Sequence, residues 1–104
     1  MTNLSLNDFK RTSSSDSVSE SYVEALKVFT NGMLERLEEN RSKGSREDWQ
    51  DPNQFSDRFF LAQAYNNLLN LEQAYRQEDW ETVRQECQDV ANFMMMISER
   101  TKTD

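Results

Sequence analysis

Apolar residues recur every three or four positions through most of this chain, and this spacing restricts its fold more than any other feature. The earliest series steps by four, four, three, four and four residues: Val18, Tyr22, Leu26, Phe29, Met33 and Leu37. Ser17 and Glu20, at the start of the series, have the spacing of a capping box. The pattern predicts a first helix over about 18–41. Gly32 weakens this helix and indicates a close approach by another helix.

The segment 42–52 contains a glycine and the only proline, and we interpret it as a loop. At its end, Asp51 fits a helix N-cap, Pro52 the first helical position and Gln54 a capping-box glutamine. These signals predict a second helix over about 52–77.

Two stripes of apolar residues run along this predicted second helix. The first holds Phe55, Phe59, Ala62 and Leu69, and the other holds Leu61, Ala64, Tyr65, Leu68, Leu71 and Tyr75. An apolar surface of this width predicts burial on more than one side.

Asp79 is the predicted N-cap of a third helix over about 79–100. Its predicted core stripe is Val83, Cys87, Val90, Met94 and Ile97. Met94, Met95 and Met96 are interpreted as core and subunit interface rather than as a metal-binding thioether group.

No segment alternates apolar and polar residues for long, so the predicted fold class is all-α, an antiparallel helical bundle of three main helices. A chain of 104 residues suggests one domain. We expect a flexible arm at 1–16, a helical domain at 17–100 and a frayed tail at 101–104. A chain this short buries a small fraction of its surface, so dimerisation or tetramerisation is expected to complete the bundle.

Composition excludes several classes of function. The chain has no histidine and one cysteine, Cys87, which excludes zinc fingers and Cys/His catalysis and leaves only a hard, oxygen-bound cation as a candidate metal. The net charge of −7 disfavours direct binding to nucleic acid. No apolar run approaches the roughly 18 residues of a membrane span, and the N-terminus lacks an apolar signal-peptide region, so no membrane partner and a cytoplasmic location are expected.

Glu86 and Asp89 stand three residues apart and project from the same side of the third helix, flanking its core stripe. A solvated helix edge would explain this pair. The alternative is half of a Mg²⁺ site, which requires further carboxylates from a separate element, with waters or phosphates completing the octahedron.

Two stretches of the chain together resemble a known family. ECQDVANFMMMI, residues 86–97, is similar to the last helix of the MazG-like, all-α nucleoside triphosphate pyrophosphohydrolases, where acid-x-x-Asp-Val-Ala-Asn-Phe recurs. RLEENRSKGSREDW, residues 36–49, resembles the Leu-x-x-Asn-x-x-Lys…Trp segment that follows the first helix in the phage and bacterial branch of that family. Its marked positions here are Leu37, Asn40, Lys43 and Trp49.

The resemblance implies an antiparallel helical bundle, usually a homodimer or a dimer of dimers, and a nucleotide as ligand. Four acids, Glu-x-x-Glu on one helix and Glu-x-x-Asp on the next, would hold Mg²⁺ (Mn²⁺ as an alternative) while a nucleoside triphosphate is cut to monophosphate and pyrophosphate. Glu86 and Asp89 match the second acidic pair and are the implied catalytic and metal-binding residues. Asn92 matches a position near the substrate, and Asn40 and Lys43 match positions that reach toward the nucleotide.

The first acidic pair is where this chain departs from the family pattern, because the matching positions are Asn67 and Asn70. Losing two of four negative charges would weaken Mg²⁺ binding, and the amides would add hydrogen-bond donors toward a ligand. Gln63 and Asn66 extend these amides into a stripe, which is either a ligand-facing or partner-facing surface or a plain polar rim.

Three functions remain open on the sequence alone. The first is a MazG-like pyrophosphohydrolase, weak or inactive because of Asn67 and Asn70. The second is a catalytically inactive protein that binds and sequesters a nucleotide or nucleotide signal, and the third is a structural helical oligomer. Trp49 either stacks on a base or pins its loop, and the cluster Arg41, Lys43 and Arg46 either faces phosphate or is solvated.

Overall fold

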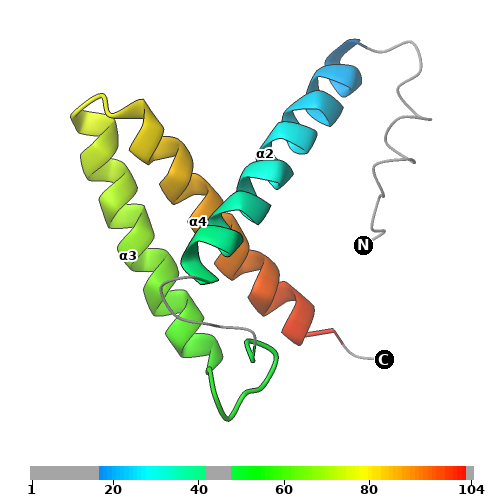
Figure 1. The fold of residues 1–104 in the computed structure, drawn as a ribbon, viewed down its shortest axis with the longest axis vertical. Coiled ribbons are helices and arrows are strands. Elements are labelled where there is room, and N and C mark those ends of the chain that lie inside the picture. The colour runs from blue at the N-terminus through cyan, green and yellow to red at the C-terminus, as the bar shows by residue number, and fades with distance from the viewer. Residues whose placement is uncertain (1–16, 42–47, 103–104) are drawn as a thin grey trace. The chain divides into compact units, whose positions relative to one another are not determined.

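The computed structural model describes residues 17–41 and 48–102, and these residues form three helices and no strand. The helices are α2 (Ser17–Arg41), α3 (Asp57–Arg76) and α4 (Trp80–Arg100), shown in Figure 1. The predicted all-α class is therefore confirmed. The predicted arm at 1–16 lies outside the described residues. In the part of the chain that is described, no helix combines the length and apolar character needed to cross a membrane.

The chain divides into two compact units within α2, residues 1–31 and 32–104. Of the first unit the structure describes residues 17–31, a helical segment in which Val23 is buried. The second unit holds the last turns of α2 together with α3 and α4, and it contains all the residues discussed below.

The predicted start of the second helix at Pro52 is wrong. Asp51 does cap a turn, because its side chain accepts from the Asn53 N–H at 2.9 Å and its carbonyl accepts two N–H groups further on. That turn ends at Ser56, whose backbone is extended with φ −80° and ψ 160°. Ser56 Oγ then accepts from the Phe59 N–H at 3.1 Å and caps α3. Asp51 therefore caps only a single turn, and α3 begins after the second cap, Ser56.

α3 and α4 run antiparallel and side by side, joined by a tight turn (Figure 1). The Asp79 N–H bonds to the Ala74 carbonyl at 2.9 Å and the Glu78 N–H to the Tyr75 carbonyl at 3.1 Å, which is the hydrogen-bond pattern of a Schellman motif. Glu78 takes φ 57°, where glycine is usual. Asp79 caps α4 as predicted, accepting from the Thr82 N–H at 3.3 Å.

The core of this unit lies between α3 and α4 and is built on aromatic rings. Its buried members are Phe60, Ala64, Phe93 and Met96. Phe60 is fully buried, although neither predicted stripe of the second helix included it. Its ring lies 5.9 Å from that of Phe93, and Arg100 sits over it with the guanidinium carbon 5.3 Å from the ring centre. Arg100 also donates to the Phe55 carbonyl at 2.6 Å, so the end of α4 is tied to the start of α3.

The core face of α4 differs from the predicted stripe. Met94 is 41% exposed, and the other predicted members are half-buried. The buried residues are Asp89, Asn92, Phe93 and Met96. The prediction followed apolar residues only, whereas two of the four buried positions are polar, and this shifted the predicted face by about one residue.

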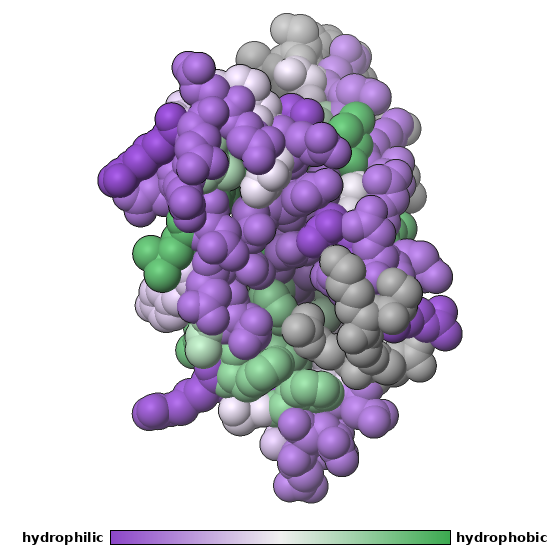
Figure 2. All heavy atoms as spheres, turned by 60° about the vertical axis from the view of Figure 1, so that its left-hand side comes forward, coloured by the Kyte–Doolittle hydropathy of each residue, from purple (hydrophilic) through white to green (hydrophobic). Residues whose placement is uncertain are grey.

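Most of the second predicted stripe of α3 lies at the surface of this chain. Its exposed members are Leu61, Tyr65, Leu68 and Tyr75, and Leu69 of the first stripe is exposed as well. The predicted burial of α3 on more than one side is therefore not found among residues 17–41 and 48–102. Figure 2 shows a face on which hydrophilic residues predominate and apolar side chains reach the surface in separate areas.

Phe60→Ala is expected to lower the free energy of unfolding by about 3–5 kcal/mol, because it removes a large side chain that is fully buried and leaves a cavity. The measurement is urea unfolding followed by circular dichroism. Leu34→Ala, at a position that is 64% exposed in α2, is the control and should change the free energy by less than about 1 kcal/mol. Equal effects of the two substitutions would contradict this description of the core.

Candidate functional site

The last turns of α2 lie against α4. A Cβ added to Gly32 would meet the side-chain amide nitrogen of Gln88 at 2.0 Å, so the Gln88 side chain from α4 lies directly against the Gly32 backbone. Four residues along α4, Asn92 donates from Nδ2 to the Met33 carbonyl at 3.0 Å. Because Gly32 has no side chain, the Gln88 side chain can lie against α2 at that point, and the Asn92 amide ties the Met33 carbonyl to α4.

Arg36 and Asp89 form a two-point ion pair across this helix contact. Arg36 donates from Nε to Asp89 Oδ1 at 3.0 Å and from Nη2 to Asp89 Oδ2 at 2.9 Å. The exposed fractions of the two side chains are 15% and 11%. A bidentate pair of this kind is strong and directional, and the low exposure limits screening by water. Both oxygens of Asp89 are therefore engaged by one guanidinium.

Arg36 also holds a second acid. Its Nη1 donates to Glu39 Oε2 at 2.6 Å, so the guanidinium lies between carboxylates from α2 and α4. The hydrogen bond with Asp89 is the main cause that raises the pKa of Arg36. Arg36 therefore keeps its positive charge at any ordinary pH.

Glu86, the other acid of the predicted pair, makes no ion pair within residues 17–41 and 48–102. Its Oε2 atom is buried and, among the described residues, makes no hydrogen bond. Burial raises the pKa of Glu86, repulsion from Asp89 raises it further, and attraction to Arg36 lowers it in part. Asn92 Oδ1, six residues further along α4, is a second buried acceptor without a hydrogen bond in the described part of the chain. Two unused acceptors beside the ion pair are unusual for a folded protein.

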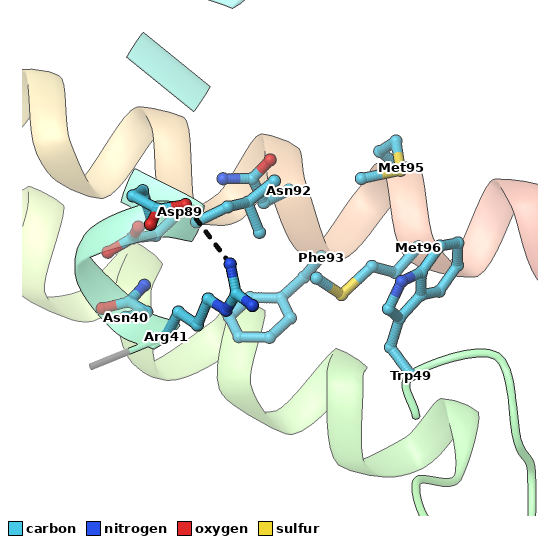
Figure 3. Close-up of a pocket in the computed structure, with 10 residues that line it drawn as sticks. Asn40, Arg41, Trp49, Asp89, Asn92, Phe93, Met95 and Met96 are labelled. Carbon is cyan, nitrogen blue, oxygen red and sulfur yellow. Dashed lines mark ion pairs between the residues drawn. The ribbon is translucent and has the colours of Figure 1, made fainter. Parts of the chain in front are cut away.

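A cavity of about 320 Å³ opens beside this ion pair (Figure 3). Its lining comes from the end of α2, the segment before α3, and α4: Leu37, Glu38, Asn40, Arg41, Trp49, Asp89, Asn92, Phe93, Met95 and Met96. Polar groups gather at the α2 end, where Asn40, Arg41 and Asp89 lie. Trp49 lies beside Met96 at the apolar end, as Figure 3 shows. The dashed line in that view is the ion pair of Arg41 Nη1 with Glu38 Oε2, at 4.0 Å.

Four of the predicted site residues meet at this cavity, namely Asn40, Trp49, Asp89 and Asn92. The other four are placed elsewhere or not described. Glu86 does not line the cavity. On α3, Asn67 is half-buried and Asn70 is exposed, and neither lines it. Lys43 lies outside the described residues.

Arg36 was not among the predicted site residues, although the chain contains a signal for it. It stands between Met33 and Leu37 of the apolar series, in a helix whose neighbouring charges are acidic. A basic residue at the edge of an apolar stripe has its stem packed against the core and its charge available to a buried acid. Its partner Asp89 is 53 residues away, a pairing that local patterns do not contain.

Comparisons of the chain with protein-family models, curated proteins and solved structures return no match. Membership of the MazG-like family therefore stays a prediction that depends on the two motifs.

The donor groups do not fit the Mg²⁺ that the resemblance implies. Asp89 has both oxygens on Arg36, and Glu86 and the two amides of α3 lie off the cavity. Among residues 17–41 and 48–102, no group of three or more acidic or cysteine side chains is arranged to hold a metal ion. A divalent cation would require Asp89 to leave its guanidinium partner.

Glu86→Gln is expected to stabilise the protein increasingly as the pH rises. The folded state raises the pKa of Glu86, so it binds this proton more tightly than the unfolded state does. The contribution of Glu86 to the free energy of unfolding therefore falls as the pH rises past the usual glutamate pKa. A glutamine at this position has no proton to lose, so its contribution stays constant. Urea unfolding at about pH 4 and about pH 7 measures this, and the gain from Glu86→Gln should be larger at the higher pH.

Glu81→Gln, at an exposed position in the first turn of α4, is the control for this experiment. A gain from Glu86→Gln that is the same at both pH values would show that the Glu86 carboxyl is not destabilised by burial.

Proposed function

We propose that this protein binds a nucleotide in the cavity between α2 and α4 and does not hydrolyse it efficiently. One observation carries the proposal: side chains from three separate segments, predicted from the motifs as nucleotide-facing, line one cavity. They are Asn40, Trp49 and Asn92, joined there by Arg41.

The chemistry of the cavity suits a nucleotide because its two ends differ. Trp49, with Phe93 and the two methionines beside it, offers an aromatic and thioether surface on which a base can stack. Asn40 has donors and acceptors that can pair with base or sugar, and Arg41 has a guanidinium suited to phosphate oxygens. The volume of about 320 Å³ is at the lower end of the range for small-molecule sites.

Binding is favoured over pyrophosphohydrolysis because of the state of Asp89. Cleavage between phosphates depends on metal ions that neutralise developing charge and activate water. Arg36 already neutralises the one acid of the predicted catalytic pair that reaches the cavity. Asn67 and Asn70 also lower the attraction for a metal ion, because their amides carry no negative charge. The cytoplasm, where nucleotides are abundant, is the setting in which we place this activity.

Trp49→Ala is expected to weaken nucleotide binding by about 1–3 kcal/mol, or roughly 5- to 150-fold in Kd, because it removes the stacking surface. Calorimetry with a panel of nucleoside mono- and triphosphates measures it. Trp80→Ala is the control, because Trp80 packs on Tyr75 and does not line the cavity. If Trp49 only pins its loop, its loss will lower thermal stability and leave the affinity of the folded protein unchanged.

Pyrophosphate release from the same panel with Mg²⁺ or Mn²⁺ distinguishes binding from hydrolysis. Turnover by the wild-type protein at ordinary enzyme rates would favour the pyrophosphohydrolase and count against the proposal. The variant Asn67→Glu with Asn70→Glu restores the acids of the family pattern, and its activity would show whether α3 can still contribute to catalysis.

We further propose that the protein acts as a homodimer that pairs through α3. From Phe59 to Leu71 this helix carries no charged residue, although 30% of the whole chain is charged. Leu61, Tyr65, Leu68 and Leu69 are exposed on it. Two chains of charge −7 repel each other, so an uncharged apolar surface is where they can meet at the lowest electrostatic cost.

Leu69→Lys is expected to convert the dimer into a monomer, because it places a charge on the uncharged face of α3 at a position that is 65% exposed. Size-exclusion chromatography with light scattering measures the mass. Leu34→Lys is the matched control, since Leu34 is 64% exposed but lies on α2. A wild-type monomer, or a dimer that survives Leu69→Lys, would overturn pairing through this face.

A further inference from the structure

Arg100, the last residue of α4, makes three contacts with residues at the start of α3. Its Nη1 donates to the Phe55 carbonyl at 2.6 Å and lies 3.4 Å from Asp57 Oδ1. Its guanidinium carbon lies 5.3 Å from the centre of the Phe60 ring. Only 8% of the Arg100 side chain is exposed, so water competes little for these contacts. The guanidinium is therefore held in one place and in turn holds the Phe55 carbonyl.

The segment 48–55 connects that carbonyl to Trp49 through two hydrogen-bonded turns. The Asp51 N–H donates to the Asp48 carbonyl at 2.8 Å, which closes a turn that contains Trp49. The Phe55 N–H donates to the Asp51 carbonyl at 3.0 Å, which closes the next turn. Because Asp51 belongs to both turns, the backbone position of Trp49 is linked to that of Phe55.

Both ends of this segment contact the last turns of α4. The Trp49 ring lies beside Met96 at the apolar end of the cavity (Figure 3). Arg100 stands one turn after Met96, so the two side chains project from the same side of the helix. We propose that Arg100 is a positioning residue of the cavity, which anchors segment 48–55 and thereby holds the Trp49 ring at the cavity wall.

The hydrogen bond of Arg100 supplies a direction that the packing of Trp49 lacks. Apolar contact of the indole ring with Met96 is favourable in many orientations, since the hydrophobic effect is non-directional. A hydrogen bond requires a defined geometry, and one from a charged donor is stronger than one between neutral groups. Without Arg100 the segment is expected to remain packed on the core, with its tryptophan in several orientations.

The position of Trp49 affects binding because a stacking surface that is already in place does not have to be ordered by the ligand. Loss of Arg100 is expected to weaken nucleotide binding although Arg100 does not line the cavity. This consequence rests on the proposed function. The anchoring of the segment depends only on the contacts of Arg100, and it is tested without a ligand.

The test uses the fluorescence of Trp49 in the full chain. Trp49 and Trp80 are the only two tryptophans, so Trp80→Phe leaves Trp49 as the single indole. In this parent, Arg100→Met keeps a long stem beside Phe60 and loses both the charge and the hydrogen bond. It is expected to shift the Trp49 emission of the folded protein to longer wavelength and to increase its quenching by acrylamide. Arg100→Lys, which keeps a charged donor, should bring both values back toward those of the parent.

Ala74→Gly is the control for a general loss of stability. Ala74 is buried near the opposite end of α3, and glycine at that position should destabilise the helix and leave the Trp49 emission of the folded protein unchanged. An emission of Arg100→Met equal to that of the parent would overturn the proposal, and so would an equal shift in Ala74→Gly.

Arg100→Gln is the second variant if Arg100→Met does not fold. It is neutral and shorter than arginine, so the same shift of the Trp49 emission is expected, and the absence of a shift would overturn the proposal. Failure of both variants to fold would overturn it as well, because Arg100 would then be required for the fold as a whole rather than for the position of Trp49.

Calorimetry with the nucleotide panel tests the consequence for binding. Arg100→Met is expected to raise Kd roughly fivefold or more. Arg76→Met is the matched control, because Arg76 pairs with Glu72 at the surface and its loss should leave Kd unchanged. A shifted Trp49 emission with an unchanged Kd would overturn the effect on binding and support the anchoring. Absence of binding by the wild-type protein would overturn the proposed function, and the Trp49 emission would still decide the role of Arg100.

Discussion

The bidentate pair of Arg36 and Asp89 is the interaction on which the arrangement of this protein's second unit depends. It joins α2 to α4 across a part-buried contact in which 15% and 11% of the two side chains are exposed. Removing one partner would leave a largely shielded charge without its counter-ion, so each partner constrains the other. The cavity opens where α2 ends on α4, and Asp89 belongs both to this pair and to the lining of the cavity.

Local patterns in the sequence were sufficient to predict where the helices lie, but they did not predict which side of each helix is buried. The apolar periodicity predicted three helices, and the ends of α2 and α4 agree with the structure within one residue. It missed the start of α3, because Asp51 and Ser56 both carry capping signals and only the geometry shows which one begins the helix. It also misplaced the core face of α4, where Asp89 and Asn92 are buried among apolar neighbours.

At the candidate site, too, local motifs predicted some residues, whereas residues whose role depends on a partner far along the chain were missed. The motifs identified Asn40, Trp49, Asp89 and Asn92, which lie in two separate stretches of the chain and meet at one cavity. They did not identify Arg36, because the value of that residue depends on an acid 53 positions away. A motif specifies which side chains are available at a site, and their charge state is decided by partners that only the folded chain brings together.

The sequence and the structure each show a loss of negative charge relative to the family pattern that the chain resembles. Compared with the family pattern it resembles, the chain carries amides at positions 67 and 70, which removes negative charge from the first acidic pair. In the structure, Arg36 neutralises the charge of Asp89, which is one acid of the second pair. The two changes involve different helices and different chemistry, yet each lowers the attraction for a divalent cation. A pocket altered in both ways keeps aromatic and amide groups at its lining, and it has less negative charge with which to attract a divalent cation.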